Sequence, residues 1–160
     1  MERLIIASIV GVLVSYIGIS IRRIFTRRVK YLIDYNAFLD GLVTELSYYR
    51  QPLIDYIDRV SDSFGKDFRH TLIQYKECIK KGDDIVLEHR LLTRSDGIII
   101  QNCFNSIGMS NVDTELASIK NSKHMAESML EKARKDAKIR GELWSKLAIL
   151  LGIALLILLV

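Results

Sequence analysis

The chain has 160 residues, of which 23 are Lys or Arg and 19 are Asp or Glu, so its formal net charge is +4 at pH 7. Residues 31–130 hold eleven basic and fifteen acidic residues, whereas basic residues gather on either side of this stretch. A nucleic-acid-binding domain carries its basic residues on the folded body, so the acidic body argues against that class and we expect no nucleic-acid partner.

The first predicted element is an apolar helix. Residues 4–21, "LIIASIVGVLVSYIGISI", contain no charge, and a helix of that length rises about 27 Å, close to the ~30 Å hydrocarbon core of a bilayer. A secretory signal peptide is the alternative. Against it, the apolar run is long, little positive charge precedes it, and no small-residue cleavage site comes before the arginines. We predict a transmembrane helix over residues 1–21, followed by the basic stretch "RRIFTRRVK".

Apolar residues then recur at helical spacing. We expect the first helix to continue to about Tyr49. Pro52 should open a second helix that stops at Gly65. A third helix should cover residues 66–81, with Gly82 as its C-cap. The apolar face of the first helix is formed by Leu32, Tyr35, Leu39, Leu42 and Leu46.

Helices are also predicted between residue 84 and the final apolar stretch. A short fourth helix is expected at about residues 84–92, and Ser95 should cap a fifth that ends at Gly108. Ser110 and Asp113 form a capping box for a sixth helix, which shows no stop signal before the final apolar stretch except Gly141. No segment alternates convincingly like a strand. Residues 22–142 are therefore predicted to form an all-α, antiparallel helical bundle.

The last predicted element is a second apolar helix, "LWSKLAILLGIALLILLV", at residues 143–160. The part without any polar side chain, residues 147–160, rises only about 21 Å, but the whole stretch rises about 27 Å. Lys146 can extend to the membrane surface, and Trp144 suits the interface. A buried hairpin helix of a soluble core is the alternative. We predict a transmembrane helix over residues 143–160.

The charges beside these two helices predict an orientation. Residues 22–30 hold five basic and no acidic residues, and residues 131–146 hold six basic and three acidic residues. We therefore expect a protein of the cell membrane. By the positive-inside rule, its central domain is cytoplasmic and both of its termini lie outside the cytoplasm. Cys78 and Cys103 show no pairing pattern, which suits a reducing compartment.

Signals for catalysis are weak. The three histidines lie on different predicted helices and make no metal-binding spacing, and neither a phosphate-binding glycine loop nor a nucleophile elbow is present. Asp83 and Asp84 are adjacent carboxylates, which acids at a helix N-terminus explain. We predict no catalytic residue, cofactor or metal, and hence no enzyme. An accessory subunit of a membrane enzyme and an unrelated membrane-anchored helical adaptor remain alternatives.

Two sets of residues are candidates for contacts with partners. The corner "ELSYYRQPL" is either a packed turn with Tyr48 in the core or a docking site for a partner. Small residues recur every three or four positions in both apolar helices, which lets helices approach closely in lipid. Three interpretations of these stripes are open. They pack on each other, they pack on other subunits, or they only reflect the composition of membrane helices. The corner comprises Glu45, Tyr48, Arg50, Pro52 and Leu53, and the stripes comprise Ser8, Gly11, Ser15, Gly18, Ser145, Ala148 and Gly152.

The whole chain resembles the stage III sporulation protein AB family of endospore-forming bacteria. The family motif Glu-(Ile/Leu)-x-Tyr-x-x-x-Pro-Leu is matched in order and spacing by Glu45, Leu46, Tyr48, Pro52 and Leu53. A second motif, Leu-Gly-x-Ser-Asp-x-x-x-Gln, reads here "IGMSNVDTE", with Asn111 in place of Asp and Glu115 in place of Gln. The final apolar stretch also resembles the family's, with Ala154 where a second Gly is expected.

The resemblance implies a function that the residues alone do not. The family's soluble region is similar to the helical domain of the inner-membrane platform protein of type II secretion and type IV pilus machines. Membership would make the chain a platform component of the secretion-like transenvelope complex that the mother cell assembles against the forespore. Its expected partners are a cytoplasmic ATPase, stage III sporulation protein AA, and other membrane components of the complex. Homo-oligomerisation is left open.

Overall fold

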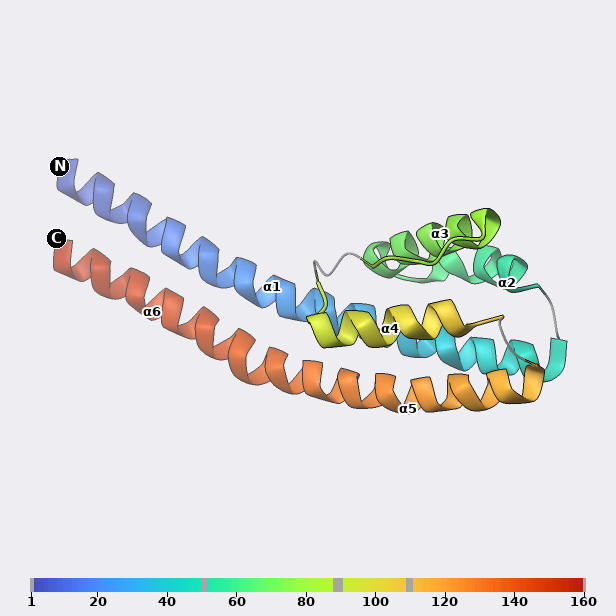
Figure 1. The fold of residues 1–160 in the computed structure, drawn as a ribbon. Helices are drawn as coiled ribbons and strands as arrows, with labels where there is room; N and C mark the ends of the chain where they lie inside the picture. The colour runs from blue at the N-terminus through green and yellow to red at the C-terminus, as the bar shows by residue number, and fades with distance from the viewer. Residues whose placement is uncertain (1, 50–51, 88–90, 109–110, 160) are drawn as a thin grey trace. The chain divides into compact units, whose positions relative to one another are not determined.

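A computed structural model describes residues 2–49, 52–87, 91–108 and 111–159. Within these ranges, the side chains of residues 2–15, 17–18, 49, 112, 155–156 and 158–159 fall outside the described structure. The described residues form helices and their connections, with no strand, so the predicted all-α class is confirmed (Figure 1). In chain order the elements are α1 (Glu2–Thr44), the π-helix η1 (Glu45–Tyr49), α2 (Leu53–Val60), the 3₁₀-helix η2 (Ser61–Ser63), α3 (Lys66–Lys81), α4 (Arg94–Ser106), α5 (Val112–Asp136), the π-helix η3 (Ala137–Gly141) and α6 (Glu142–Leu159).

The chain divides into two compact units. Unit 1 comprises residues 1–29 and 132–160, and unit 2 comprises residues 30–131. In unit 1, Arg28 Nη1 lies 3.2 Å from Asp136 Oδ2, and the Phe25 ring packs against the backbone of Gly141, where a Cβ would sit 3.5 Å from Phe25 Cδ2. Phe25 comes before Arg28 in the chain, whereas Gly141, which Phe25 contacts, comes after Asp136, which pairs with Arg28. The two segments therefore run antiparallel. No helix has, within its described residues, an apolar stretch long enough to cross a bilayer.

Unit 2 is built around a cluster of aromatic side chains. Phe38 contacts rings from α2, α3, α4 and the turn before α3, with centroid separations between 5.5 and 6.4 Å. Edge-on and tilted ring pairs of this kind add about 0.5–1.5 kcal/mol each beyond the area they bury. The cluster comprises Tyr31, Tyr35, Phe38, Tyr56, Phe64, Phe68, Tyr75 and Phe104.

Polar contacts fix the register of α1 against α5 within unit 2. The side chain of Asn36 is buried and its Nδ2 donates to the carbonyl oxygen of Ala126 at 3.2 Å. One turn further along α1, Asp40 pairs with Lys123. The same Nδ2 donates to the Leu32 carbonyl oxygen at 2.7 Å within α1. Sliding of the two helices is disfavoured because it would break the second hydrogen bond, the one that crosses the interface.

Several predicted helix boundaries are confirmed. Helical structure continues from α1 to Tyr49 through η1, and from α5 through η3 into α6. Helix α3 occupies the predicted residues, and Gly82 ends it in the left-handed region, at φ 75°. Helix α2 follows Pro52 as expected, but it ends at Val60, and a 3₁₀ turn leads towards Gly65.

Other local predictions are wrong. The helix expected at about residues 84–92 is absent from the described part of that stretch, since residues 83–87 and 91–92 are not helical. Instead, Ile85 and Leu87 are buried while Val86 between them is 76% exposed, which is the alternation of an extended segment. Side chains of α4 hold this segment: Asn105 Oδ1 accepts from Ile85 N at 3.0 Å, and Gln101 Oε1 accepts from Leu87 N at 3.4 Å.

The caps of the last two helices of unit 2 also differ from the prediction. Helix α4 is capped by Thr93, whose Oγ1 accepts from the backbone N of Asp96 at 3.2 Å, and not by Ser95. Helix α5 is capped by Asn111, whose Oδ1 accepts from Thr114 N at 3.1 Å. Ser110, the predicted cap of that helix, lies outside the described residues.

Candidate functional site

The corner after α1 is anchored by Glu45, the first residue of η1. Its side chain is buried, and its Oε2 pairs with the Arg59 guanidinium of α2. That guanidinium also lies over the Tyr56 ring, 5.7 Å from the centroid. A buried carboxylate needs such a cation to offset the loss of water. The first residue of the predicted docking set is therefore structural, because it ties the end of α1 to α2.

Two other residues of the corner, Tyr48 and Pro52, are exposed. Tyr48 is 81% exposed, so the alternative that places it in the core is wrong. Pro52 is exposed at the N-cap of α2, and Leu53 behind it is half-buried. Arg50 lies outside the described residues. The structure thus presents an exposed tyrosine on a turn whose base is held by an ion pair.

Tyr56 and Gly41 make a close contact beside this corner that the sequence analysis missed. The Tyr56 hydroxyl donates to the carbonyl oxygen of Phe38 at 3.1 Å, and its ring crosses α1 where Gly41 has no side chain. Burial raises the pKa of Tyr56 to about 12, so the hydroxyl keeps its proton and stays a donor at neutral pH. The signal in the sequence is a glycine inside a long helix, which otherwise costs stability.

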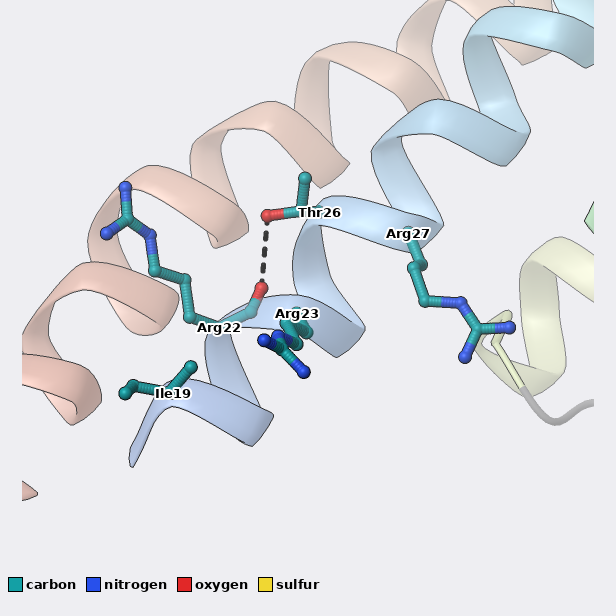
Figure 2. A pocket seen from close by; sticks show the side chains of 5 residues that line it. All are labelled: Ile19, Arg22, Arg23, Thr26 and Arg27. Carbon is teal, nitrogen blue, oxygen red and sulfur yellow. Dashed lines mark hydrogen bonds between the residues drawn. The ribbon is translucent and has the colours of Figure 1, made fainter. Parts of the chain in front are cut away.

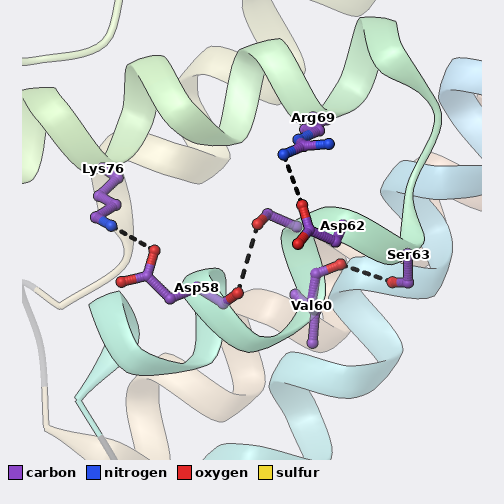
Figure 3. A network of polar contacts seen from close by, with 7 residues as sticks. Asp58, Val60, Asp62, Ser63, Arg69 and Lys76 are labelled. Carbon is purple, nitrogen blue, oxygen red and sulfur yellow. Dashed lines mark hydrogen bonds and ion pairs between the residues drawn. The ribbon is translucent and has the colours of Figure 1, made fainter.

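Helices α2 and α3 are joined by a polar seam on the surface of unit 2 (Figure 3). Lys76 pairs with Asp58, and Arg69 Nη2 lies 2.6 Å from Asp62 Oδ1. Ser63 Oγ donates to the Val60 carbonyl oxygen at 2.6 Å, within the 3₁₀ turn. Exposed ion pairs of this type contribute about 0–1 kcal/mol each. The seam therefore orients the two helices and is not evidence of a binding site.

Unit 1 carries a basic face on α1 (Figure 2). Ile19, Arg22, Arg23, Thr26 and Arg27 line a concavity of about 350 Å³. Their spacing of three and four residues places them on one side of the helix. Figure 2 shows the three arginine side chains spreading outward from this side, and Thr26 Oγ1 donates to the Arg22 carbonyl oxygen at 3.1 Å. We call these five residues the basic face.

The stripe of small residues in α6 faces inward. Ser145 and Gly152 are buried and Ala148 is half-buried, so the predicted residues of α6 share one covered side. The first-helix residues of the prediction, Ser8, Gly11, Ser15 and Gly18, lie outside the described side chains. The remaining surface of α6 exposes large apolar residues: Leu143, Trp144, Leu147, Ile149, Leu150, Leu151, Ile153 and Ile157.

The candidate groups for chemistry lie apart in the described structure. Its residues include no cluster of three or more His, Cys, Asp or Glu side chains that could hold a metal ion. Asp83 and Asp84 are exposed on the segment after α3, where no helix begins, so their explanation as helix N-terminal acids is wrong. His70 and His124 are exposed on α3 and α5. His89 lies outside the described residues.

The second motif region forms a turn between α4 and α5. The Glu115 side chain is buried, and its Oε1 accepts from the backbone N of Gly108 at 2.7 Å. Gly108 adopts a φ of 87°, a conformation that a side chain would strain. Together with the Asn111 cap, these contacts show that the two residues that differ from the motif, Asn111 and Glu115, both support the turn.

A family model matches almost the whole chain. The family model described as stage III sporulation protein AB (spore_III_AB) matches residues 3–160. Comparisons with curated proteins and with solved structures each found no match. The family match covers both units and includes the corner, the turn between α4 and α5, and the apolar helix α6.

Proposed function

Because the chain belongs to the stage III sporulation protein AB family, we propose that it is a membrane-anchored platform component of the transenvelope complex between mother cell and forespore. The match over residues 3–160 carries this proposal. The role is architectural. The helical bundle receives a cytoplasmic ATPase, stage III sporulation protein AA, and the apolar ends hold the other membrane components beside it. The bundle is expected to be similar to the platform domain of type II secretion machines.

Two helices, over residues 1–21 and 143–160, anchor the chain in this proposal. The support from α6 is its division into a covered side of small residues and an exposed side of large apolar ones. Apolar surface costs about 25 cal/mol per Å² in water, and large exposed apolar patches are typical of surfaces that contact lipid or protein. Lipid would cover the exposed side and leave the small residues for helix packing.

Cysteine labelling in cells tests the orientation. Asp84 is exposed on a non-helical segment of unit 2, so Asp84→Cys gives a reporter for the central domain. We expect a membrane-impermeant thiol reagent to label it only after permeabilisation. A cysteine added after Val160 should be labelled in intact cells. The parent chain is the control, because Cys103 is buried and Cys78 half-buried. Labelling of Asp84→Cys but not of the added cysteine in intact cells would contradict the orientation.

We place the docking site for the ATPase at the exposed part of the corner, around Tyr48. The Glu45–Arg59 ion pair holds the backbone on either side of it, so Tyr48 would be ordered before binding. Tyrosine is among the residues that are enriched at hot spots of protein interfaces, because it brings a large contact area with few rotatable bonds.

Substitution of Tyr48 tests this docking site. Tyr48→Ala in the full-length chain should lower co-purification of the ATPase about tenfold and reduce the number of heat-resistant spores, in line with a loss of 1–2 kcal/mol at a hot spot. Arg50→Glu should act in the same direction. Val86→Ala is the control, since Val86 is also exposed on unit 2, at 76%. If the corner variants lower the melting temperature of the chain and leave ATPase binding unchanged, the docking assignment is wrong.

A further inference from the structure

The π-helix η3 lies within unit 1, between the end of α5 and the start of α6, and the helix continues through it without a break (Figure 1). A π-helix closes each hydrogen-bonded turn over one residue more than an α-helix does, and it occurs mostly as a single turn inside an α-helix. The stretch between Asp136 and Glu142 therefore holds one residue in excess of the α-helical register. This extra residue changes the direction of every later side chain by about 100° about the helix axis.

The buried residues on either side of η3 show what this rotation does. Ala133 is buried in α5, and Ser145 and Gly152 are buried in α6. At 100° per residue, a plain α-helix would place Ser145 about 120° and Gly152 about 100° away from Ala133. The extra residue subtracts about 100°, so that Ser145 lies at about 20° and Gly152 at about 0°. The π-helix thus brings the small residues of α6 onto the side of the helix that is covered in α5.

Contacts with α1 hold this arrangement at both ends of η3. Arg28 pairs with Asp136, the residue before the π-helix. The Phe25 ring packs on Gly141, the last residue of the π-helix, which is buried. Residues 138–140 between these two contacts are exposed. Because a π-helical turn is rare compared with an α-helical one, we attribute its presence here to the packing of unit 1.

A second arrangement of the same residues follows from this geometry. If η3 became α-helical, α6 would turn by about 100°, and each covered position would pass to the residue one place earlier in the chain. The covered side would then hold large apolar side chains, which are now more than half exposed. In this arrangement Trp144, Leu147 and Leu151 would replace Ser145, Ala148 and Gly152.

The two arrangements have different advantages. The first places small residues against α1, which permits close approach of the two helices. The second restores the common α-helical hydrogen bonds and covers large apolar side chains, while it leaves the small residues free for another helix. A partner that binds one of two arrangements more tightly shifts the population towards it.

We propose that η3 is a rotational switch of α6. In its π setting, which the structure shows, the small residues face α1. In its α setting, they are turned about 100° away from it, where an apolar helix of another subunit would pack on them. This inference goes beyond the proposed function, in which the chain is a fixed platform.

Pairs of introduced cysteines distinguish the two settings in the purified full-length chain. A Cβ at position 141 would lie 3.6 Å from Phe25 Cβ, and disulfides join Cβ atoms that are about 3.5–4.5 Å apart. Phe25→Cys with Gly141→Cys should therefore crosslink in the π setting. Phe25→Cys with Arg140→Cys should crosslink in the α setting, where residue 140 takes the place of residue 141. Mass spectrometry of protease fragments identifies the joined cysteines.

Deletion of Lys138 supplies the decisive comparison. The deletion removes the extra residue, so a plain α-helix then places Gly141 where the π-helix places it now, and α6 has no second setting. The full-length chain should form both crosslinks. The deletion should abolish the crosslink at position 140 and keep the crosslink at position 141. Lys138→Ala is the matched control, because it removes the same side chain but keeps the extra residue, and it should leave both crosslinks unchanged.

Three results on the purified chain would overturn the switch. The crosslink at position 140 could be missing from the full-length chain, or it could form equally well in the deletion chain; either result would mean that α6 has one setting. Loss of the crosslink at position 141 from the deletion chain, through rotation or through unfolding, would mean that η3 holds no extra residue. These measurements need neither a membrane nor the ATPase, so they test the switch separately from the proposed function.

Spore formation shows whether cells use the second setting. The deletion should lower the number of heat-resistant spores, whereas Lys138→Ala should leave it unchanged. An equal decrease in both strains would mean that the lysine side chain matters and the extra residue does not. A normal number of spores from the deletion strain would mean that α6 works in the π setting alone, and it would leave the proposed platform role intact.

Discussion

At the scale of single residues, unit 2 depends on the place where the Tyr56 side chain crosses α1. Alanine is a better helix former than glycine by about 1 kcal/mol, so Gly41→Ala would be expected to stabilise an exposed helix. Here a Cβ at position 41 would overlap the Tyr56 hydroxyl. The ring would have to move, and its hydrogen bond to the Phe38 carbonyl oxygen would be lost.

We predict that Gly41→Ala lowers the free energy of unfolding by about 1–3 kcal/mol, because overpacking costs about 1–3 kcal/mol and the lost hydrogen bond costs about 1 kcal/mol, whereas the gain in helix propensity is about 1 kcal/mol. Urea unfolding of the full-length chain in detergent measures this. Tyr56→Phe removes the overlapping hydroxyl, so the double variant should lose less than the sum of the single variants. A stabilised Gly41→Ala chain would mean that the tyrosine does not cross α1 at this point.

At the scale of helices and turns, the sequence predicts those features that depend on nearby residues, such as the ends of a helix and its buried face. Helix α3 is bounded by Gly65 and Gly82, and its apolar residues recur at helical spacing, so both its bounds and its buried face follow from its own residues. The segment after it does not follow in this way. Ile85 and Leu87 are held by Asn105 and Gln101 of α4, and contacts over such sequence distances leave no pattern within the segment.

The candidate corner shows the same division. Its position follows from Pro52 and from the motif. The α-helical period that buries Leu39 and Leu42 places Tyr48 on the opposite side of the helix, where it is exposed. The burial of a carboxylate at Glu45 and the change to a π-helix there do not follow from the spacing, because they depend on the ion pair with Arg59.

At the scale of the whole molecule, charge separates between the two units. Unit 1 has a net charge of +8, and unit 2, with twelve basic and sixteen acidic residues, has a net charge of −4. The excess of basic residues thus belongs to the unit that contains both apolar ends. Anionic lipids on the cytoplasmic side of a membrane would favour such a distribution.

The packing of the apolar ends can be tested at α6. Gly152 is buried on the covered side of this helix and Ala154 is exposed. Gly152→Leu therefore adds a large apolar side chain to the covered side of α6, and Ala154→Leu adds one to its exposed side. Both changes raise apolarity, and we expect both chains to reach the membrane fraction in normal amounts. Gly152→Leu should separate the packed helices, because small residues permit their close approach. It should lower the melting temperature of the purified chain, co-purification of the other membrane components and the number of heat-resistant spores, whereas Ala154→Leu should be mild.

The melting temperature identifies what packs on the stripe. If Gly11 lies on the matching side of α1, Gly11→Leu should lower the melting temperature of the purified chain as Gly152→Leu does, and the double variant should be little worse than either single variant, since both break one interface. Loss of co-purification with an unchanged melting temperature would instead place the stripe against a different subunit. A double variant that melts, assembles and sporulates as the parent chain does would be a third outcome. That result would show that the stripe of Ser145, Ala148 and Gly152 forms no interface, despite its covered position.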